Sequence, residues 1–235
     1  MRLPAAKAMG GTLAAVLVTG VVGSYLIFFT PQAPAPVTLT DPEDQTLAAR
    51  IEESDPAGRW AVQEGSEAGY RVREKLARLP AASDAVGRTG KVTGDILLSG
   101  TGGNYAVSEI NVEVDMTSLT SDSPRRDNAL RDRGLETDRF PTATFRSREP
   151  VDLPAGLRSG ERLSLVLHGA LTIHGVTRHV SIPVEARLMS GSVEVAGSLI
   201  IPLADFGITP PNVANIVSVE PTGIMEFRLV LEKVV

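Results

Sequence analysis

Residues 162–188 alternate between apolar and polar positions in two long runs. In the first run, which ends at Ile173, the odd positions carry leucine, glycine or isoleucine, and the even positions include serine, threonine and histidine. In the second run, the even positions from Val180 to Leu188 are apolar. A period of two is typical of a β-strand with one dry face, and the short turn at Gly175 predicts a β-hairpin. Its strands would reach roughly 40 Å, against about 17–20 Å for an ordinary strand, which favours a tall curved sheet or a barrel.

Similar alternating runs continue along most of the chain after residue 58. They start at Trp60 and Tyr70 and then cover residues 91–98, 107–116, 142–147, 192–203 and 224–232. About eight strands, one short helical insertion and no strand–helix–strand spacing predict an all-β fold, an antiparallel barrel. An eight-stranded barrel encloses a space that side chains fill or that holds one small apolar ligand.

The apolar, inward-facing positions of these strands are the candidate binding residues. Alternation identifies the face of a strand, but it does not separate residues that touch a ligand from residues that form core. The candidates are Ile110, Val112, Val114, Phe145, Leu165, Leu167, Leu171, Ile182, Val184, Val195, Leu199, Phe206, Phe227 and Leu229.

Residues 117–140 interrupt the strand pattern. Ser123 is a suitable N-cap for a helix that begins at Pro124, and Gly134 stands where a C′ glycine would end it after about ten residues. The segment carries arginine at positions 125, 126, 131 and 133 and aspartate at 127 and 132. One interpretation is a solvated cap with local ion pairs worth under about 1 kcal/mol each. The other is a segment that grips the head group of a ligand.

Residues 10–30 contain no charged side chain. A helix of that length covers the roughly 30 Å hydrocarbon core of a bilayer, so we expect an N-terminal transmembrane helix. Arg2 and Lys7 precede it, which places the N-terminus in the cytoplasm and the rest of the chain outside it. A cleaved signal peptide is the main alternative, with Ala33 and Ala35 in the Ala-x-Ala near its end. A buried soluble helix is disfavoured, because the run is not amphipathic.

Three regions follow from these patterns. Residues 1–30 form a short cytoplasmic stub and the membrane anchor, and residues 31–57 form a stalk that is first rich in proline and alanine and then charged. Residues 58–235 form the barrel domain. The expected location is the cell membrane, with a single pass and an extracytoplasmic C-terminal domain.

The composition excludes several kinds of site. The chain has no cysteine, which rules out disulfides and thiolate chemistry, and its net charge of −5 gives no basic surface for nucleic acid. His168 and His174 lie roughly 20 Å apart on one strand face, and His179 does not complete a three-ligand zinc site. No nucleophile elbow or phosphate-binding loop occurs in the sequence. We therefore expect no metal, no cofactor and no enzymatic activity.

Four segments in order resemble the YceI-like family of bacterial polyisoprenoid-binding proteins. They are RD and LR within residues 126–131, FPTATF at 140–145, GALTIHGVT at 169–177 and DFGI at 205–208. The resemblance covers about residues 58–235. It implies an extended, lipocalin-like antiparallel barrel whose apolar channel takes the tail of an isoprenoid, such as a polyprenyl quinone or phosphate.

The resulting prediction is a membrane-anchored protein that sequesters or carries a polyisoprenoid. A second hypothesis is an envelope interaction module whose barrel is packed solid and whose Arg/Asp-rich insertion binds a partner protein. A third, ranked below both, is an enzyme that acts on the lipid head group through His174 or His179. A continuous cavity would favour the first hypothesis and a filled interior the second. The sequence leaves the oligomeric state open, and a homodimer is compatible with it.

Overall fold

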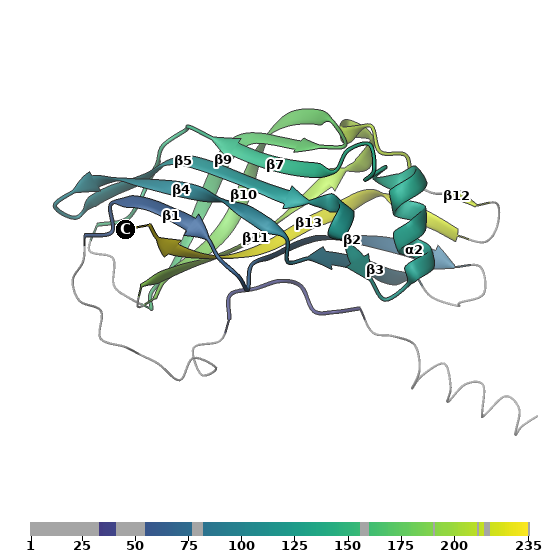
Figure 1. The fold of residues 1–235 in the computed structure, drawn as a ribbon, viewed down its shortest axis with the longest axis horizontal. Helices are drawn as coiled ribbons and strands as arrows, with labels where there is room; N and C mark the ends of the chain where they lie inside the picture. Colours follow the sequence, from purple (N-terminus) through teal and green to yellow (C-terminus); the bar gives the residue numbers. More distant parts are fainter. Residues whose placement is uncertain are drawn as a thin grey trace, which may run out of the picture. The chain divides into compact units, whose positions relative to one another are not determined.

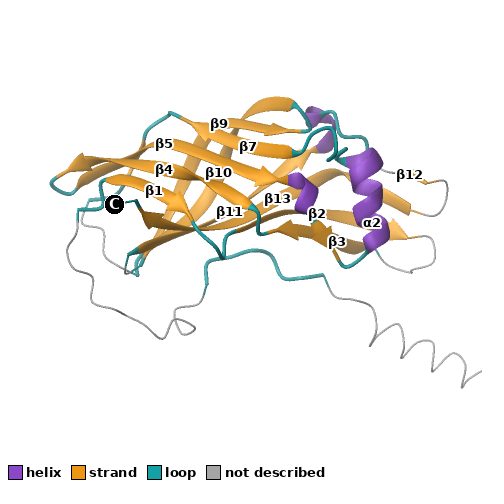
Figure 2. Cartoon of the chain, viewed as in Figure 1, coloured by secondary structure: helices purple, strands orange, loops and turns teal. Residues whose placement is uncertain are grey.

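Long antiparallel strands make up most of the described chain (Figures 1 and 2). The computed structural model describes residues 33–40, 55–76, 82–155, 160–189, 191–210, 212–213 and 217–234. The strands are β1 (Gly58–Val62), β2 (Glu67–Leu76), β3 (Ser83–Thr89), β4 (Val92–Thr101), β5 (Asn104–Asp115), β6 (Thr120–Ser121), β7 (Thr142–Ser147), β8 (Val151–Asp152), β9 (Arg162–Ile173), β10 (Val176–Leu188), β11 (Ser192–Pro202), β12 (Asn212–Val213) and β13 (Val217–Lys233). The helical segments are η2 (Met116–Ser118), α2 (Pro124–Ala129), η3 (Leu130–Gly134) and η4 (Leu203–Phe206).

The sheet closes on itself between β1 and β13. Its order is β1-β4-β5-β7-β9-β10-β11-β13, and β13 pairs back with β1. Strand β13 is long enough to pair with β1 near its C-terminal end and with β2 along the rest, while β3 pairs with β2 and β4 with β1. Thus β1 and β2 share one strand position, and β3 and β4 share another. The predicted antiparallel eight-stranded barrel with a short helix is confirmed.

Two clusters of buried residues lie on the inner side of the barrel. The larger one includes Trp60 and Leu231, which lie where β1 meets β13, and Leu231 is fully buried. The indole of Trp60 donates to the carbonyl of Pro56 at 3.0 Å, so its polar atom is satisfied. The second cluster gathers around Phe206 and Ile208, beside η4.

The hairpin β9–β10 is formed as the alternating pattern predicts. Its register runs from Val176 opposite Ile173 to Arg187 opposite Arg162. The two turn residues, His174 and Gly175, have φ angles of 53° and 71°. Positive φ at both positions is the geometry of a type I′ turn, whose twist matches that of the flanking strands.

Two local predictions were wrong, and the strands on either side of residues 99–106 are longer than the alternating runs, because β4 continues to Thr101 and β5 begins at Asn104. The last strand begins at Val217 rather than Ile224, with a register shift before Gly223 that breaks the alternation. Gly134 is not a C′ residue in a left-handed conformation. It lies within the π-helical turn η3, where the amide of the following leucine bonds the carbonyl of Leu130.

Membrane anchoring is not visible in the described part of the chain. The predicted anchor at residues 10–30 and the charged part of the stalk at 41–54 lie outside the described residues. Within the ranges that are described, no helix has the length and apolarity needed to cross a bilayer.

Residues 34–40, here called the strap, pack against the outside of the barrel. The sequence predicted a spacer at this point, whereas the strap is held by side chains of the sheet. Arg71 donates to the carbonyl of Pro34 at 2.8 Å, and Arg88 donates to the carbonyl of Ala35. At the far end, the amide and hydroxyl of Thr40 donate to Glu194 at 3.0 and 2.6 Å. The extended conformation leaves the strap's own backbone groups free for these contacts.

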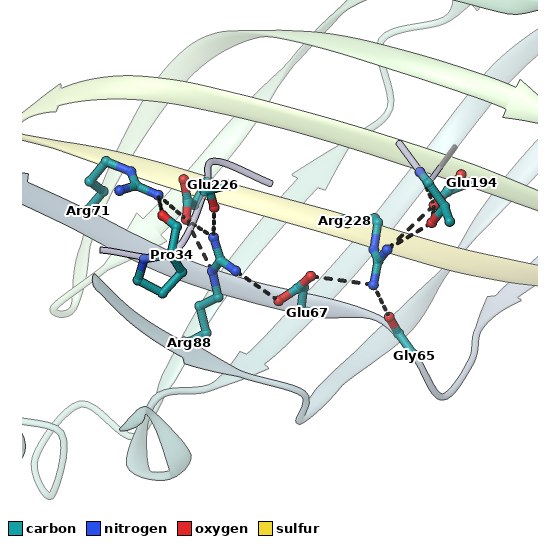
Figure 3. Close-up of polar contacts among 10 residues, drawn as sticks. Pro34, Gly65, Glu67, Arg71, Arg88, Glu194, Glu226 and Arg228 are labelled. Atoms are coloured by element: carbon teal, nitrogen blue, oxygen red, sulfur yellow. Dashed lines mark hydrogen bonds and ion pairs between the residues drawn. The ribbon is translucent and has the colours of Figure 1, made fainter. Parts of the chain in front are cut away.

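The strap covers a layer of charged residues on the outer face of the sheet (Figure 3). Arg88 donates to Glu226 at 2.8 Å, and Arg71 lies 3.5 Å from the same carboxylate. Arg187 pairs with Glu194 at 3.0 Å. Glu226 and Arg187 are each only 1% exposed, although both point away from the barrel interior. Alternation correctly assigned these residues to the outer face, but it could not show that the strap buries them.

Hydrogen bonds keep Glu194 ionised beneath the strap. Burial by itself raises the pKa of a carboxyl group, but the hydrogen bonds from Thr40 and the pairing with Arg187 outweigh it and lower the pKa of Glu194 below its ordinary 4.5. A carboxyl whose pKa is lower in the folded state stabilises the fold above the unfolded pKa. That contribution is lost as the pH falls through the folded-state pKa.

We expect Glu194→Gln to lower the free energy of unfolding by about 3–5 kcal/mol at pH 7, because it leaves a buried arginine without its carboxylate. The variant should also lose the part of the acid sensitivity below about pH 4.5 that comes from this group. Urea unfolding at several pH values measures both effects. The matched control is Glu185→Gln, whose pair with Arg162 at 3.4 Å is half exposed, and it should cost under about 1 kcal/mol. Equal losses in the two variants would contradict the assigned role of the strap.

The hairpin turn gives a second prediction. A Cβ atom on Gly175 would lie 2.7 Å from Cε1 of Phe140, whereas one on Gly102 would meet nothing within 4 Å. Both glycines have positive φ, so alanine carries a backbone cost of about 1–2 kcal/mol at either site. Gly175→Ala should lower the free energy of unfolding by a further amount of about 1–3 kcal/mol, because the added Cβ clashes with Phe140. Thermal or urea unfolding of Gly175→Ala and Gly102→Ala measures this difference. Equal stabilities would show that Phe140 moves aside.

Candidate functional site

A cavity of about 1260 Å³ lies inside the barrel. Small-molecule sites usually occupy about 300–1,000 Å³, so this space is large for a domain of this size. Its wall is formed mainly by inward-facing aliphatic side chains from nearly every long strand. The arrangement suits a long apolar molecule.

Most of the candidate binding residues lie in the cavity wall. The wall includes Ile110, Val112, Val114, Phe145, Leu165, Leu167, Leu171, Ile182, Val184, Val195, Phe227 and Leu229. Leu199 and Phe206 do not line the cavity. Leu199 packs between the two buried clusters, and Phe206, 2% exposed, belongs to η4, where strand parity does not apply.

The sequence reasoning missed the contribution of β2 to the wall. Ala68, Tyr70, Val72 and Glu74 all line the cavity. They occupy alternate positions of one strand, which the alternation at Tyr70 predicted, but its inner face was not included among the candidate binding residues. A strand with charged residues on its outer face can still direct its alternate residues into the barrel.

One end of the cavity is polar and lies beside α2. Figure 1 shows α2 at one end of the barrel and the β4–β5 turn at the other. Ser123 caps α2 as predicted, with its hydroxyl accepting from the amide of Arg126 at 3.5 Å. Arg126 donates to Glu74 at 2.7 Å and also pairs with Asp122. The helix is thereby tied to β2 across the mouth of the cavity, and its arginines reach the wall.

Tyr70 sits at this same end. Its ring lies over Gly87 of β3, where a Cβ atom would come within 2.4 Å of Cε1 of the tyrosine. The hydroxyl is buried and has no hydrogen-bond partner among the described residues. Burial raises the pKa of Tyr70 well above its usual value. The group therefore stays protonated and remains a hydrogen-bond donor at neutral pH.

The opposite end of the cavity is lined by Asp55, Gly103 and Tyr105. The carboxylate of Asp55 accepts from the amide of Ala57 at 3.0 Å and from the hydroxyl of Tyr105. These bonds lower the pKa of Asp55, while desolvation and the bond to Asp55 raise the pKa of Tyr105. The polar side chains at this end thus satisfy one another.

The histidines lie away from the cavity wall. His168 is exposed and bonds Ser181 at 2.9 Å. His174 is in the hairpin turn, with Nδ1 3.2 Å from the carbonyl of Phe206. His179 is exposed. None of the three lines the cavity, and no group of three or more potential metal ligands occurs within the residues that the structure describes.

Curated relatives match parts of the chain. A UPF0312 protein of Vibrio cholerae is 32% identical over 125 residues, which is 50% of this chain and 62% of that protein. A UPF0312 protein of Vibrio parahaemolyticus is 37% identical over 83 residues, 35% of this chain and 40% of that protein. The matched region therefore spans less than two thirds of the length of these relatives.

Solved structures share the fold. A polyisoprenoid binding domain from Saccharophagus degradans superimposes with a TM-score of 0.57 at 20% identity, covering 76% of this chain and 99% of that one. BcnA from Burkholderia cenocepacia gives a TM-score of 0.52 at 19% identity, covering 72% and 98%. The family model described as "YceI-like domain" matches residues 60–231, which run from β1 to β13. Because that match takes in the whole closed barrel and its cavity, the chain belongs to the YceI-like family.

Proposed function

We propose that the protein is a membrane-anchored, extracytoplasmic lipid-binding protein that sequesters or carries a polyisoprenoid, either a polyprenyl quinone or a polyprenyl phosphate. The observation that carries this proposal is the apolar cavity of about 1260 Å³. Each methylene that leaves water for such a cavity gains about 0.8 kcal/mol. A long isoprenoid tail gains enough in this way to offset the cost of ordering a flexible chain.

Two further observations support binding in the cavity. The Saccharophagus degradans domain with the same fold is described as polyisoprenoid binding. The alternative of an interaction module required a barrel packed solid, and the interior of this barrel is hollow. Catalysis on a head group required His174 or His179 at the cavity mouth, and both lie outside its wall.

Anchoring to the membrane is proposed from residues 10–30, which carry no charge. The hydrogen bonds of the strap argue against the alternative of a cleaved signal peptide. Cleavage after Ala35 would remove the carbonyl groups of Pro34 and Ala35, which accept hydrogen bonds from Arg71 and Arg88. Such a cleavage would leave two arginines of the barrel without these acceptors, which favours an uncleaved anchor.

Protein purified from membranes should carry an isoprenoid that organic extraction and mass spectrometry identify. Val112→Trp places an indole in the cavity wall and should lower the lipid recovered per protein by about tenfold, since it fills space that the tail needs. The control is Val166→Trp, the same change at a site 44% exposed on the outer face of β9, and it should retain lipid. Recovery of no isoprenoid from the unaltered protein would defeat the proposal.

The full chain should remain in the membrane pellet after an alkaline wash, because a transmembrane helix is held by the hydrophobic effect and not by charge. Intact mass spectrometry of the pelleted protein should return a mass that still includes residues 10–30. A mature protein that starts near residue 36 and appears in the soluble fraction would instead establish a cleaved signal peptide.

A further inference from the structure

Arg125 is an uncommitted cation at the mouth of the cavity. It lies in the first turn of α2, its side chain is exposed, and it forms part of the cavity wall. Within the described residues it has no hydrogen bond or ion pair. A guanidinium group offers five donors and no acceptor. A ligand with acceptor oxygens at this end of the cavity can therefore replace the water that solvates this guanidinium.

The acidic residues near Arg125 are already engaged by other groups. Glu74 accepts from Arg126 at 2.7 Å, and Asp122 pairs with that same arginine. Asp127 accepts from the hydroxyl of Ser121 at 2.6 Å and from its amide at 3.0 Å. Two of these carboxylates thus pair with Arg126, and the third holds Ser121 against the helix. The guanidinium of Arg125 stays available for a ligand.

Tyr70 carries a second donor without a partner at the same end; its hydroxyl is covered, so a ligand contacts it only after the ring turns. Its ring lines the cavity, and its buried hydroxyl is unpaired. A buried polar group without a partner costs roughly 1–3 kcal/mol, so such a group usually marks a site that a ligand or water completes. At the other end of the cavity, Asp55 and Tyr105 bond each other.

The geometry points to a defined polarity for the bound lipid. Resting on the proposed function, we propose that the head group lies at the α2 end, where Arg125 and Tyr70 donate to its oxygens, while the tail runs toward the β4–β5 turn. The chemical class is a prenyl lipid whose head group offers acceptor oxygens. A phosphate and a quinone carbonyl share that chemistry, and the phosphate alone adds a full negative charge for Arg125.

The test compares three ligands with one tail on the delipidated full-length protein in detergent: geranylgeranyl phosphate, a geranylgeranyl benzoquinone and geranylgeraniol. Isothermal titration gives the dissociation constants. Arg125→Gln should weaken binding of the phosphate about tenfold and of the quinone about threefold, and leave the alcohol within about twofold. The control is Arg133→Gln, an exposed arginine of the same segment outside the cavity wall, and it should change none of them.

Tyr70→Phe separates a binding role from a structural one. Removing an unpaired buried hydroxyl should raise the melting temperature of the lipid-free protein, because a desolvated donor is lost. The same variant should weaken binding of the phosphate and the quinone about threefold, because the head group loses a donor. A hydroxyl with a purely structural role would not produce these opposite effects.

A photoreactive diazirine next to the phosphate of geranylgeranyl phosphate locates the head group directly. Peptide mapping should find the label on residues 119–135 and not on residues 103–107. If Arg125→Gln leaves all three ligands unchanged and the label falls at the β4–β5 turn, the proposed polarity is wrong while lipid binding stands. If the unaltered protein binds none of the three ligands, the proposed function fails with it.

Discussion

Closure of the sheet between β1 and β13 is the constraint on which the rest of the structure depends. An open sheet of this length would expose a row of unpaired backbone groups at each edge, and pairing its first strand with its last removes most of them. Closure also gives the sheet a mainly apolar inner face. The aliphatic side chains that alternation directs inward then surround a hollow rather than a packed plug, because eight tilted strands enclose more space than these residues fill.

The two faces of the barrel are stabilised by different means. Inside, apolar side chains form the wall of the cavity and two buried clusters. Outside, β2, β10, β11 and β13 carry arginine and glutamate that the strap removes from solvent. A buried pair such as Arg187 with Glu194 adds little net stability compared with apolar packing, but removing one partner is costly. The charged layer therefore makes the fold depend on the strap remaining in place.

The sequence predicted the hairpin at β9–β10, the N-cap of α2 and twelve of the residues that line the cavity, because each follows from local periodicity or capping chemistry. It did not predict that Leu199 packs between clusters or that Phe206 lies in η4, since both depend on where the chain leaves the sheet. The strap was also missed. Its bonds join residues more than thirty positions apart, the closest being the 37 positions between Pro34 and Arg71, and no local pattern records such a pairing.

The strap also changes where the folded domain starts. Alternation places the first strand near residue 58, yet Pro34–Val235 is the compact unit, and carbonyl groups from residues 34–40 complete the coordination of three arginines on the sheet. A fragment that starts at the first strand would expose to solvent the closely spaced charged side chains that the strap covers on four strands. Its solubility and shape would then vary with ionic strength in a way that the intact chain avoids. The segment that the sequence suggested was part of a stalk is therefore an outer layer of the barrel wall.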